Sequence, residues 1–551
     1  MPAIDAETEY VTKVLADAGI AVSKIDERSF PEERWLIVYV PEESLVAAQS
    51  TAGSVERSLN DAGHGGSEGK SSWVVTFRPT AAGDATVEVA GRSRLATRQV
   101  DQLIQLLEAR SRTSDALPSL KYVEDPRASL AAVGASRHHL IYGRRGVGKT
   151  ALLLEAKRNA ERQGHVAVWF NAHVVRQLDA ASAFCVIAES ALDTLAKHGG
   201  SSSGASFARI QKESDDLAVL RANDKLSDAA IGKKLPDLNQ ALRAVLREGL
   251  VRIYIYIDDF YLLPVAVQPA VLDYLAGMLR DCDGWLKVAS IERLTRPFEP
   301  SSKVGLEVPH DASIIDLDVT LEDPESAQNF LESVLSNYTT TAGISKPASI
   351  TKPQALGRLV LASGGVPRDY LNLFATSIVV ARTARELARE VGKEDVAVAA
   401  GRAARGKKRD LELDVASANA RELLTALEQV AKYVKGRGHT YFLINVAQKM
   451  LHNYELLGQL VDLRFAHLVQ AALSDQHRPG IRYEAYVLDL SEFTDIRLKR
   501  GLNVLDLEAG KWTWRLTGKA RTMERLTSTQ LRDRLRQAPV VDLQDLMALE
   551  G

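Results

Sequence analysis

The sequence predicts a multidomain α/β protein with a mostly parallel sheet in its central part. Its 551 residues exceed the roughly 250–300 at which a single hydrophobic core stops growing, so we expect several domains. Between residues 139 and 290, short apolar strands alternate with amphipathic helices, which is the pattern of a parallel sheet covered by helices. After residue 324 the apolar spacing becomes helical. We therefore expect an α/β core followed by a helical domain.

Composition excludes several classes of protein. Lys and Arg number 69 against 71 for Asp and Glu, so no surface-wide basic field attracts polyanions and any nucleic-acid contact must be local. The two cysteines, Cys185 and Cys282, are too few for a disulfide scaffold or a Cys-rich zinc site and suit a reducing compartment. Neither a secretory signal nor an apolar run of about 20 residues is visible. We expect a cytoplasmic protein without membrane contact.

Residues 1–110 predict a small N-terminal α+β module. The expected strands are Trp35–Val40, Trp73–Phe77 and Thr86–Ala90, and helices are expected over 42–62 and 97–109. A polar stretch after residue 110 is interpreted as a linker. The module contains no motif that indicates catalysis.

The rest of the chain divides into three predicted domains. We place the α/β core at residues 121–320, a helical lid at 321–405 and a C-terminal domain at 411–535. Inside the core, the polar stretch after the Gly/Ser-rich segment 198–206 is interpreted as an insertion with weak helical character. The basic group Lys407, Lys408 and Arg409 is interpreted as a solvated linker before the last domain.

One motif in the core indicates phosphate binding. Residues 143–150 match G-x-x-x-x-G-K-[ST] and stand between the apolar strand 139–142 and a Leu-rich helix, which is the context that the motif requires. Glycines let the backbone wrap around phosphates, and amides at the helix N-terminus face the anion. The lysine neutralises phosphate oxygens and the hydroxyl binds Mg²⁺. We assign nucleotide binding to Gly143, Arg144, Arg145, Gly146, Val147, Gly148, Lys149, Thr150 and Ala151.

A second motif ends the strand at 252–257 in two carboxylates. Asp258 is expected to bind Mg²⁺ together with Thr150. Asp259 stands where a carboxylate can orient an attacking water, although it is one methylene shorter than the Glu often found there. The alternative role of Asp259 is structural. Magnesium and ATP are the cofactors that these motifs predict.

Four further polar residues follow in the sequence. Ser290 ends the next strand and is a candidate contact to the terminal phosphate. Arg293 and Arg296 follow it, and each is either a phosphate contact or a surface ion pair. In the helical segment, Pro367 starts a helix after two glycines, and Arg368 projects from its first turn as a candidate catalytic arginine.

Together these motifs resemble the AAA+ ATPases, particularly the origin-recognition-like branch and the STAND-type switch ATPases. The resemblance covers residues 121–402, about half of the chain. It implies a P-loop NTPase parallel sheet with a helical lid, ATP and Mg²⁺ held near Tyr122–Arg127 and the phosphate loop, and Arg368 as a second sensor of phosphate. Asp258-Asp259 in place of Asp-Glu departs from ordinary AAA+ usage and implies slow hydrolysis.

The C-terminal domain looks like a winged helix. Glu455–Val461 and Arg464–Ser474 are expected to be two helices joined by a turn, and Arg482–Leu490 a strand of the following hairpin. Origin-recognition relatives carry such a domain. Its positive side chains are interleaved with acidic ones, so DNA contact and docking of a protein partner stay open as alternatives.

Two functional hypotheses follow from the resemblance and the motifs. In the first, an ATP-dependent switch couples its nucleotide state to DNA binding or remodelling and to assembly. In the second, a STAND-type signalling or defence scaffold senses a protein or nucleic acid and forms oligomers with ATP. The C-terminal domain would then inhibit instead of binding DNA.

Overall fold

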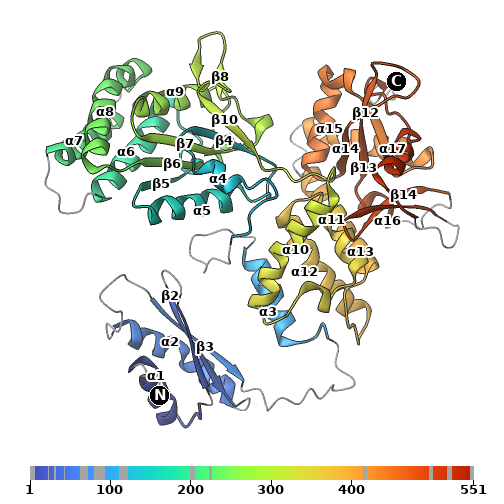
Figure 1. The fold of residues 1–551 in the computed structure, drawn as a ribbon, viewed down its shortest axis with the longest axis horizontal. Helices are drawn as coiled ribbons and strands as arrows, with labels where there is room; N and C mark the ends of the chain where they lie inside the picture. Colours follow the sequence, from blue (N-terminus) through green and yellow to red (C-terminus); the bar gives the residue numbers. More distant parts are fainter. Residues whose placement is uncertain are drawn as a thin grey trace. The chain divides into compact units, whose positions relative to one another are not determined.

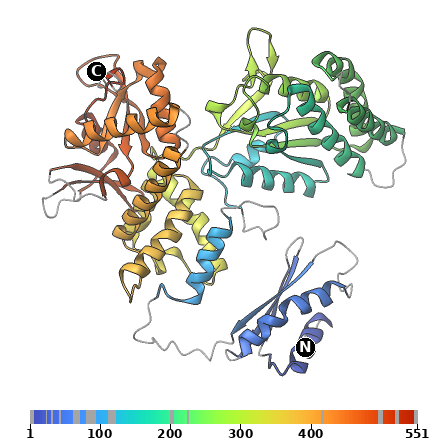
Figure 2. The ribbon, with the colours of Figure 1, turned by 180° about the vertical axis from the view of Figure 1, so that it is seen from behind.

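The computed structural model describes residues 6–22, 24–29, 33–41, 44–61, 72–79, 94–110, 122–198, 205–222, 226–413, 418–494, 501–517 and 524–545 (Figure 1, Figure 2). The chain divides into two compact units: residues 1–92 with 115–118, and residues 93–114 with 119–551. Within the described ranges, no helix combines the length and the apolar character that a membrane crossing requires.

The N-terminal unit is an α+β module, as its pattern predicts. In chain order it contains α1 (Ala6–Asp17), β1 (Lys24–Ser29), β2 (Glu33–Val40), α2 (Leu45–Asp61) and β3 (Ser72–Pro79). The sheet order is β1-β2-β3, with β1–β2 antiparallel and β2–β3 parallel. Side chains of α2 bond the outer edge of β3: Trp73 and Val75 donate their amides to Asn60 and Glu56 at 2.7 and 2.8 Å. The expected strand at Thr86–Ala90 lies outside the described residues.

Helix α3 (Arg98–Arg110) belongs to the second unit, so the boundary predicted at residue 110 is wrong. Its apolar residues Val100, Leu103 and Leu107 join the core of the helical lid. Arg382 of the lid donates to Asp101 at 2.7 Å and also to the carbonyl of Leu95. An amphipathic helix shows in its sequence that it needs a partner, but not which one.

The core is a five-stranded parallel sheet with helices on both faces. Its strands are β4 (His138–Tyr142), β5 (Val166–Asn171), β6 (Ile253–Asp258), β7 (Gly284–Ala289) and β10 (Ala312–Asp316), in the spatial order β10-β4-β7-β6-β5. One apolar layer lies between the sheet and helices α4 (Ser129–Val133) and α5 (Lys149–Arg162). The opposite layer packs against α6 (Ala180–His198) and α9 (Gln268–Leu279). The predicted parallel sheet is confirmed.

The insertion predicted after residue 198 is well-formed helix. It contains α7 (Ala205–Arg221) and α8 (Asp228–Gly249), whose buried residues Ile210, Leu217 and Leu242 extend the α6 layer. The other short elements of the core are β8 (Phe298–Glu299), β9 (Val304–Gly305) and the 3₁₀ turns η2 (Ala172–Val175), η3 (Phe260–Leu262) and η4 (Glu292–Leu294). The sequence underestimates how helical this segment is, because packing stabilises α7 and α8 more than their own helix propensity does.

The lid consists of α10 (Pro324–Thr341), α11 (Pro353–Ser363), α12 (Pro367–Ala384) and α13 (Lys393–Leu413), with the short turn η5 (Pro347–Ser349). Helix α13 runs through the expected linker at residues 405–411. Lys407 therefore donates to the carbonyl of Leu463 at 3.3 Å, and Lys408 pairs with Glu492 at 2.6 Å. The interpretation of this basic group as a solvated linker is wrong, because helix and C-terminal domain bury it in part.

The C-terminal domain begins with α14 (Ala418–Gly436), β11 (Tyr441–Asn445), η6 (Val446–Met450) and α15 (His452–Asp462). The hairpin β12 (Ala466–Ser474) and β13 (Arg482–Leu488) follows, and the sheet order is β11-β13-β12. The helix expected at Arg464–Ser474 is thus a strand, because pairing with β13 decides its conformation. The order helix, strand, turn, helix, hairpin suits the winged-helix assignment, which stays a prediction.

The C-terminal domain contains a second small sheet. It contains β14 (Asn503–Glu508), β15 (Lys511–Leu516) and β16 (Glu524–Arg525), after the short α16 (Ser491–Thr494), and α17 (Ser528–Arg536) follows. Strand β14 packs against α11 so closely that a Cβ at Gly357 would meet the backbone of Leu507. Arg358 of α11 and Asp506 of β14 form a buried ion pair at 2.5 Å.

Candidate active site

The predicted phosphate loop lies between β4 and α5, as expected. Gly143, Gly146 and Gly148 have φ values of +153°, +88° and +110°, which favour glycine. A Cβ at Gly143 would lie 2.8 Å from Val147 Cγ2, so the loop is also too tight for a side chain there. The turn leads directly into the N-terminus of α5, whose unpaired amides attract anions.

Lys149 is buried at the start of α5, with 7% of its surface exposed. Its Nζ donates to the carbonyl oxygens of Gly143 at 2.6 Å and Arg144 at 3.1 Å. Burial lowers the pKa of Lys149, and the nearby Asp318 and Asp258 partly oppose this effect. An ammonium has three hydrogens, so one remains for a phosphate oxygen.

Asp258 ends β6 with its carboxylate beside Thr150. Thr150 Oγ1 donates to Asp258 Oδ2 at 2.7 Å, so the structure brings together the two predicted Mg²⁺ ligands. Burial, and then the charge of Asp259, raise the pKa of Asp258 to about 6. A buried carboxylate with a raised pKa gains from a cation beside it, and a hydroxyl and a carboxylate are oxygen ligands of the kind that Mg²⁺ prefers. The residues therefore fit this ion.

Asp259 adopts a left-handed conformation with φ of 54°. Its amide donates to Asp258 Oδ1 at 3.0 Å, which fixes the orientation of the first carboxylate. Left-handed φ values in residues other than glycine cost free energy and gather at functional sites. The role of Asp259 in orienting water stays a prediction.

Ser290 follows β7, which lies between β4 and β6 in the sheet, so it stands between the phosphate loop and Asp258. Its Oγ lies 2.5 Å from Thr295 Oγ1, and Thr295 Oγ1 donates to the carbonyl of Ile291 at 2.6 Å. Because Thr295 has one hydroxyl hydrogen, Ser290 must donate to Thr295. Ser290 then has no hydrogen for a phosphate oxygen in this arrangement.

Both arginines after Ser290 form ion pairs. Arg293 Nη2 lies 2.8 Å from Asp462 Oδ2, at the end of α15 in the C-terminal domain. Arg296 pairs with Glu299 at 2.5 Å. These contacts match the ion-pair alternative for each residue, and a contact of Arg293 with phosphate stays a prediction.

Arg368 lies against the phosphate loop. Its amide donates to the carbonyl of Gly146 at 3.2 Å, and a Cβ at Gly146 would lie 2.8 Å from Arg368 Cβ. The charge of Arg368 also acts to lower the pKa of Lys149. The lid helix α12 thus begins at the loop, where the resemblance implies a second sensor.

Residues 127–284, which contain the phosphate loop, Asp258 and Asp259, match the family model described as AAA ATPase domain. This part of the chain is an AAA ATPase domain. No curated protein matches the chain. The parallel sheet and the loop described above are the fold that this assignment requires.

Some solved structures are similar to the chain at low identity. The ORC1 protein of Aeropyrum pernix in complex with DNA is 16% identical, with a TM-score of 0.34, over 70% of this chain and 93% of that one. Drosophila ORC bound to DNA is 11% identical, with a TM-score of 0.27, over 70% and 94%. A RuvB mutant of Thermotoga maritima is 14% identical, with a TM-score of 0.26, over 50% and 64%. Likenesses at this level say nothing about function in this chain.

Arg144 joins the AAA domain to the lid. Its amide and Nε donate to Asp318 Oδ1 at 2.9 and 3.1 Å, and its Nη2 donates to the carbonyls of Val319 and Gly364, each at 3.0 Å. Asp318 was missed in the sequence, although it is a carboxylate just after a strand end. Arg145 instead lies over the ring of Tyr261, with its Cζ 5.2 Å from the centroid.

The segment Tyr122–Arg127, near which the resemblance places ATP and Mg²⁺, contacts the end of β10. Arg127 donates to Asp316 Oδ2 at 2.9 Å and to the carbonyl of Asp318 at 3.1 Å; the carboxylate of the same Asp318 accepts from Arg144. Asp125 caps the start of α4 by accepting from Ser129 Oγ at 2.9 Å. These contacts fix the segment at the edge of β10.

Gly364, the first of the two glycines before Arg368, contacts the C-terminal domain. A Cβ at Gly364 would overlap the ring of His467, which is buried on β12 and pairs with Asp489 at 3.2 Å. Asp369, next to Arg368, forms an ion pair with Arg464 and lies 3.9 Å from Lys407. The start of α12 therefore touches the phosphate loop on one side and the C-terminal domain on the other.

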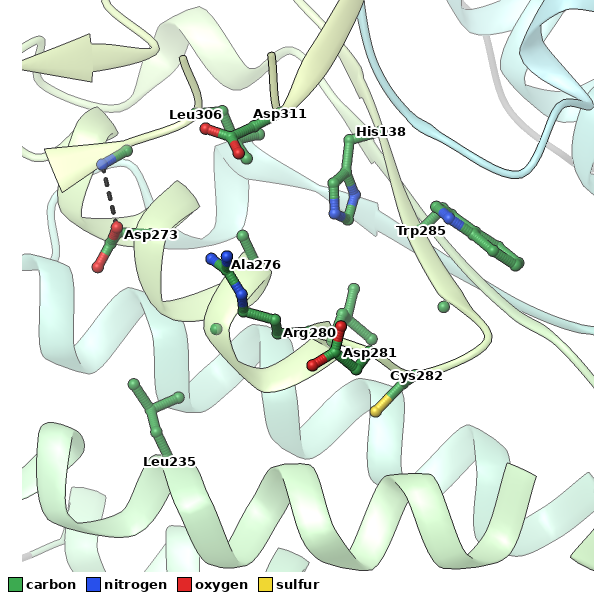
Figure 3. A pocket seen from close by; sticks show the side chains of 14 residues that line it. His138, Leu235, Asp273, Ala276, Arg280, Asp281, Cys282, Trp285, Leu306 and Asp311 are labelled. Carbon is green, nitrogen blue, oxygen red and sulfur yellow. Dashed lines mark hydrogen bonds between the residues drawn. The ribbon is translucent and has the colours of Figure 1, made fainter. Parts of the chain in front are cut away.

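A cavity of about 480 Å³ lies at the opposite end of the strands (Figure 3). His138 at the start of β4 and Gly284 at the start of β7 line it, together with residues from the end of α9. Asp273 in its wall accepts a hydrogen bond from the amide of Gly305 at 3.2 Å. No predicted site residue lines this cavity, so it is separate from the phosphate loop of the AAA domain.

Proposed function

We propose that the protein is an ATP-dependent switch that hydrolyses ATP slowly and sets the position of its lid and C-terminal domain by nucleotide state. The observation that carries the proposal is the place of Arg368. It lies on the phosphate loop through Gly146, while the next residue, Asp369, pairs with Arg464 of the C-terminal domain. A phosphate bound at the loop would therefore act on the start of the lid helix α12 and on the C-terminal domain at the same time.

The site residues have separate roles in this proposal. Lys149 neutralises the phosphate oxygens, and Thr150 and Asp258 hold Mg²⁺, which would neutralise charge on the β- and γ-phosphates. Asp259 orients the attacking water, and its short side chain is one reason to expect slow turnover. Arg368 stabilises phosphate charge and transmits its presence to the lid.

The output of the switch has two candidate forms. The tip of the β12–β13 hairpin, with His477, Arg478 and Arg482 exposed, supports local DNA contact. Helix α15 supports docking to protein or self-assembly, because it carries Glu455 and Asp462 but neither Lys nor Arg. DNA phosphates repel an acidic helix, so α15 is poorly suited to be a DNA recognition helix.

Nucleotide binding tests the proposal directly. We expect the wild-type chain to bind ATP more tightly with Mg²⁺ than without it. Lys149→Ala should weaken ATP affinity by about 100-fold or more, because it removes a buried charge at the phosphates. Calorimetric titration measures both, with Lys157→Ala as the matched control. Lys157 lies on the same helix α5 but pairs with Glu161 on the surface. Unchanged affinity in Lys149→Ala would refute the assignment.

A salt titration of duplex DNA binding separates the two outputs. Contact through the hairpin predicts affinity that falls steeply with salt and weakens in Arg478→Ala. No binding, or a flat salt response with and without ATP, would reject the DNA output. Light scattering with and without ATP would then measure self-assembly.

A further inference from the structure

Gln268 is a fully buried glutamine next to the site, with 0% of its surface exposed. It is the first residue of α9, but its side chain forms hydrogen bonds with residues outside this helix. Its Nε2 donates to the carbonyls of Leu263 at 2.9 Å and Leu294 at 3.1 Å, and its Oε1 accepts from the amide of Arg296 at 2.7 Å. Both amide hydrogens and the carbonyl are therefore used, which fixes the orientation of the side chain.

These bonds join two short turns that carry predicted site residues. The first is η3, where the amide of Leu262 donates to the carbonyl of Asp259 at 2.9 Å. The amide of Leu263 donates to Phe260 at 3.1 Å, so Leu263 is linked to Asp259 by one tight turn. A displacement of Leu263 would therefore move Asp259.

The second turn is η4, which carries Arg293. The amides of Leu294 and Thr295 donate to Ile291 and Glu292, each at 3.0 Å. The Ser290–Thr295 hydroxyl pair ties this turn to the end of β7. Gln268 holds the C-terminal end of the turn, because it bonds the carbonyl of Leu294 and the amide of Arg296.

We propose that Gln268 is a positioning residue that locks η3 and η4 together, so that Asp259 keeps a fixed distance from the turn that carries Arg293. The inference rests on the proposed ATPase function. All three hydrogen bonds of this buried side chain go to backbone groups outside α9, two as donor and one as acceptor. Such bonds are strong in a low-dielectric interior and restrict the movement of one turn relative to the other. The positions of the Asp259 carboxylate and of the turn that carries Arg293 then depend on each other.

The test compares Gln268→Met with Gln328→Met. Methionine keeps the volume but removes the hydrogen bonds. Gln328 is the control, since it is 8% exposed and also forms side-chain hydrogen bonds, with Glu332 of its own helix α10 at 2.5 Å and with the amide of Gly510 at 2.7 Å. We expect Gln268→Met to lower kcat by about tenfold or more with KM changed less, because a misplacement of about 1 Å can cost about 100-fold. It should also reduce the preference for ATP over ADP. Gln328→Met should keep both properties.

Two further variants make the result decisive. In an Asp259→Asn background, Gln268→Met should lower kcat by less than twofold, because the residue acts through Asp259. Gln268→Asn is too short to reach both turns and should give a milder loss of the same kind, which serves if the methionine variant does not fold. Wild-type kcat and ATP preference in the folded Gln268 variants, equal losses in Gln328→Met, or full additivity with Asp259→Asn would each overturn the inference. A wild-type chain that binds no MgATP would instead refute the proposed function.

Discussion

The phosphate site and the junction between the helical lid and the C-terminal domain differ in how their buried charges are compensated. At the site, Asp258 is buried beside Asp259, and its pKa is raised to about 6. At the junction, Asp369 faces Arg464 and Lys407, and Arg358 faces Asp506. A buried charge without an ion-pair partner lowers stability until a ligand of opposite charge binds beside it. A buried charge with a partner holds two elements together. The comparison separates charged groups that bind a ligand from charged groups that hold two parts of the fold together.

The largest effect on stability should come from breaking the junction. Arg464→Met leaves Asp369 buried with only the more distant Lys407 nearby, and removal of one partner of a buried pair costs about 3–5 kcal/mol. We expect the free energy of unfolding in urea to fall by about 3 kcal/mol. Arg525→Met is the control, since the Arg525 side chain is 64% exposed and lies 3.7 Å from Glu508. Solvent screens this longer pair, so its loss should change stability by less than about 1 kcal/mol. Equal effects of the two substitutions would contradict the comparison.

The site should respond in the opposite direction. The folded pKa of Asp258, about 6, lies above the ordinary value of 3.8, so its contribution to stability is present below about pH 4 and is lost as the pH rises through 6. Asp258→Asn removes this charge and should stabilise the nucleotide-free protein at pH 7.5 by about 2 kcal/mol, with no gain near pH 4. Thermal unfolding across pH measures it, and the exposed Asp281→Asn is the control. A loss of stability at pH 7.5 would show that the carboxylate is stabilising.

The phosphate site was predictable because its chemistry is local. The spacing of Gly143–Thr150, and of Asp258 behind an apolar strand, fixes both the residue types and the edge of the sheet where they meet. Thr150, at the start of α5, and Asp258, at the end of β6, meet at this edge, with Thr150 Oγ1 2.7 Å from Asp258 Oδ2. The helices and strands of the core follow from apolar periodicity for the same reason.

The junction was not predictable because its contacts join residues far apart in sequence. Residues 466–474 have an apolar pattern that suits a short helix as well as a strand, and only pairing with β13 decides between them. Helix α3 needed a partner, but its sequence did not show that the lid supplies it. Nothing in the sequence around Asp369 indicates Arg464, and Gln268 looked like any residue at a helix start.

Arg293 lies between these two regions and should give the smallest effect. Its pair with Asp462 leaves both side chains about a third exposed, at 34% and 32%, so solvent screens the charges. Asp462 also stands at the C-terminal end of α15, where the helix dipole disfavours a negative charge and the arginine offsets it. We expect Arg293→Ala and Asp462→Ala each to change unfolding free energy by less than about 1 kcal/mol, with a coupling of a few tenths of a kcal/mol in a double-mutant cycle. A coupling energy well above about 1 kcal/mol between Arg293 and Asp462 would place this pair with the contacts that hold the lid and C-terminal domain together. Arg293 would then be held away from phosphate.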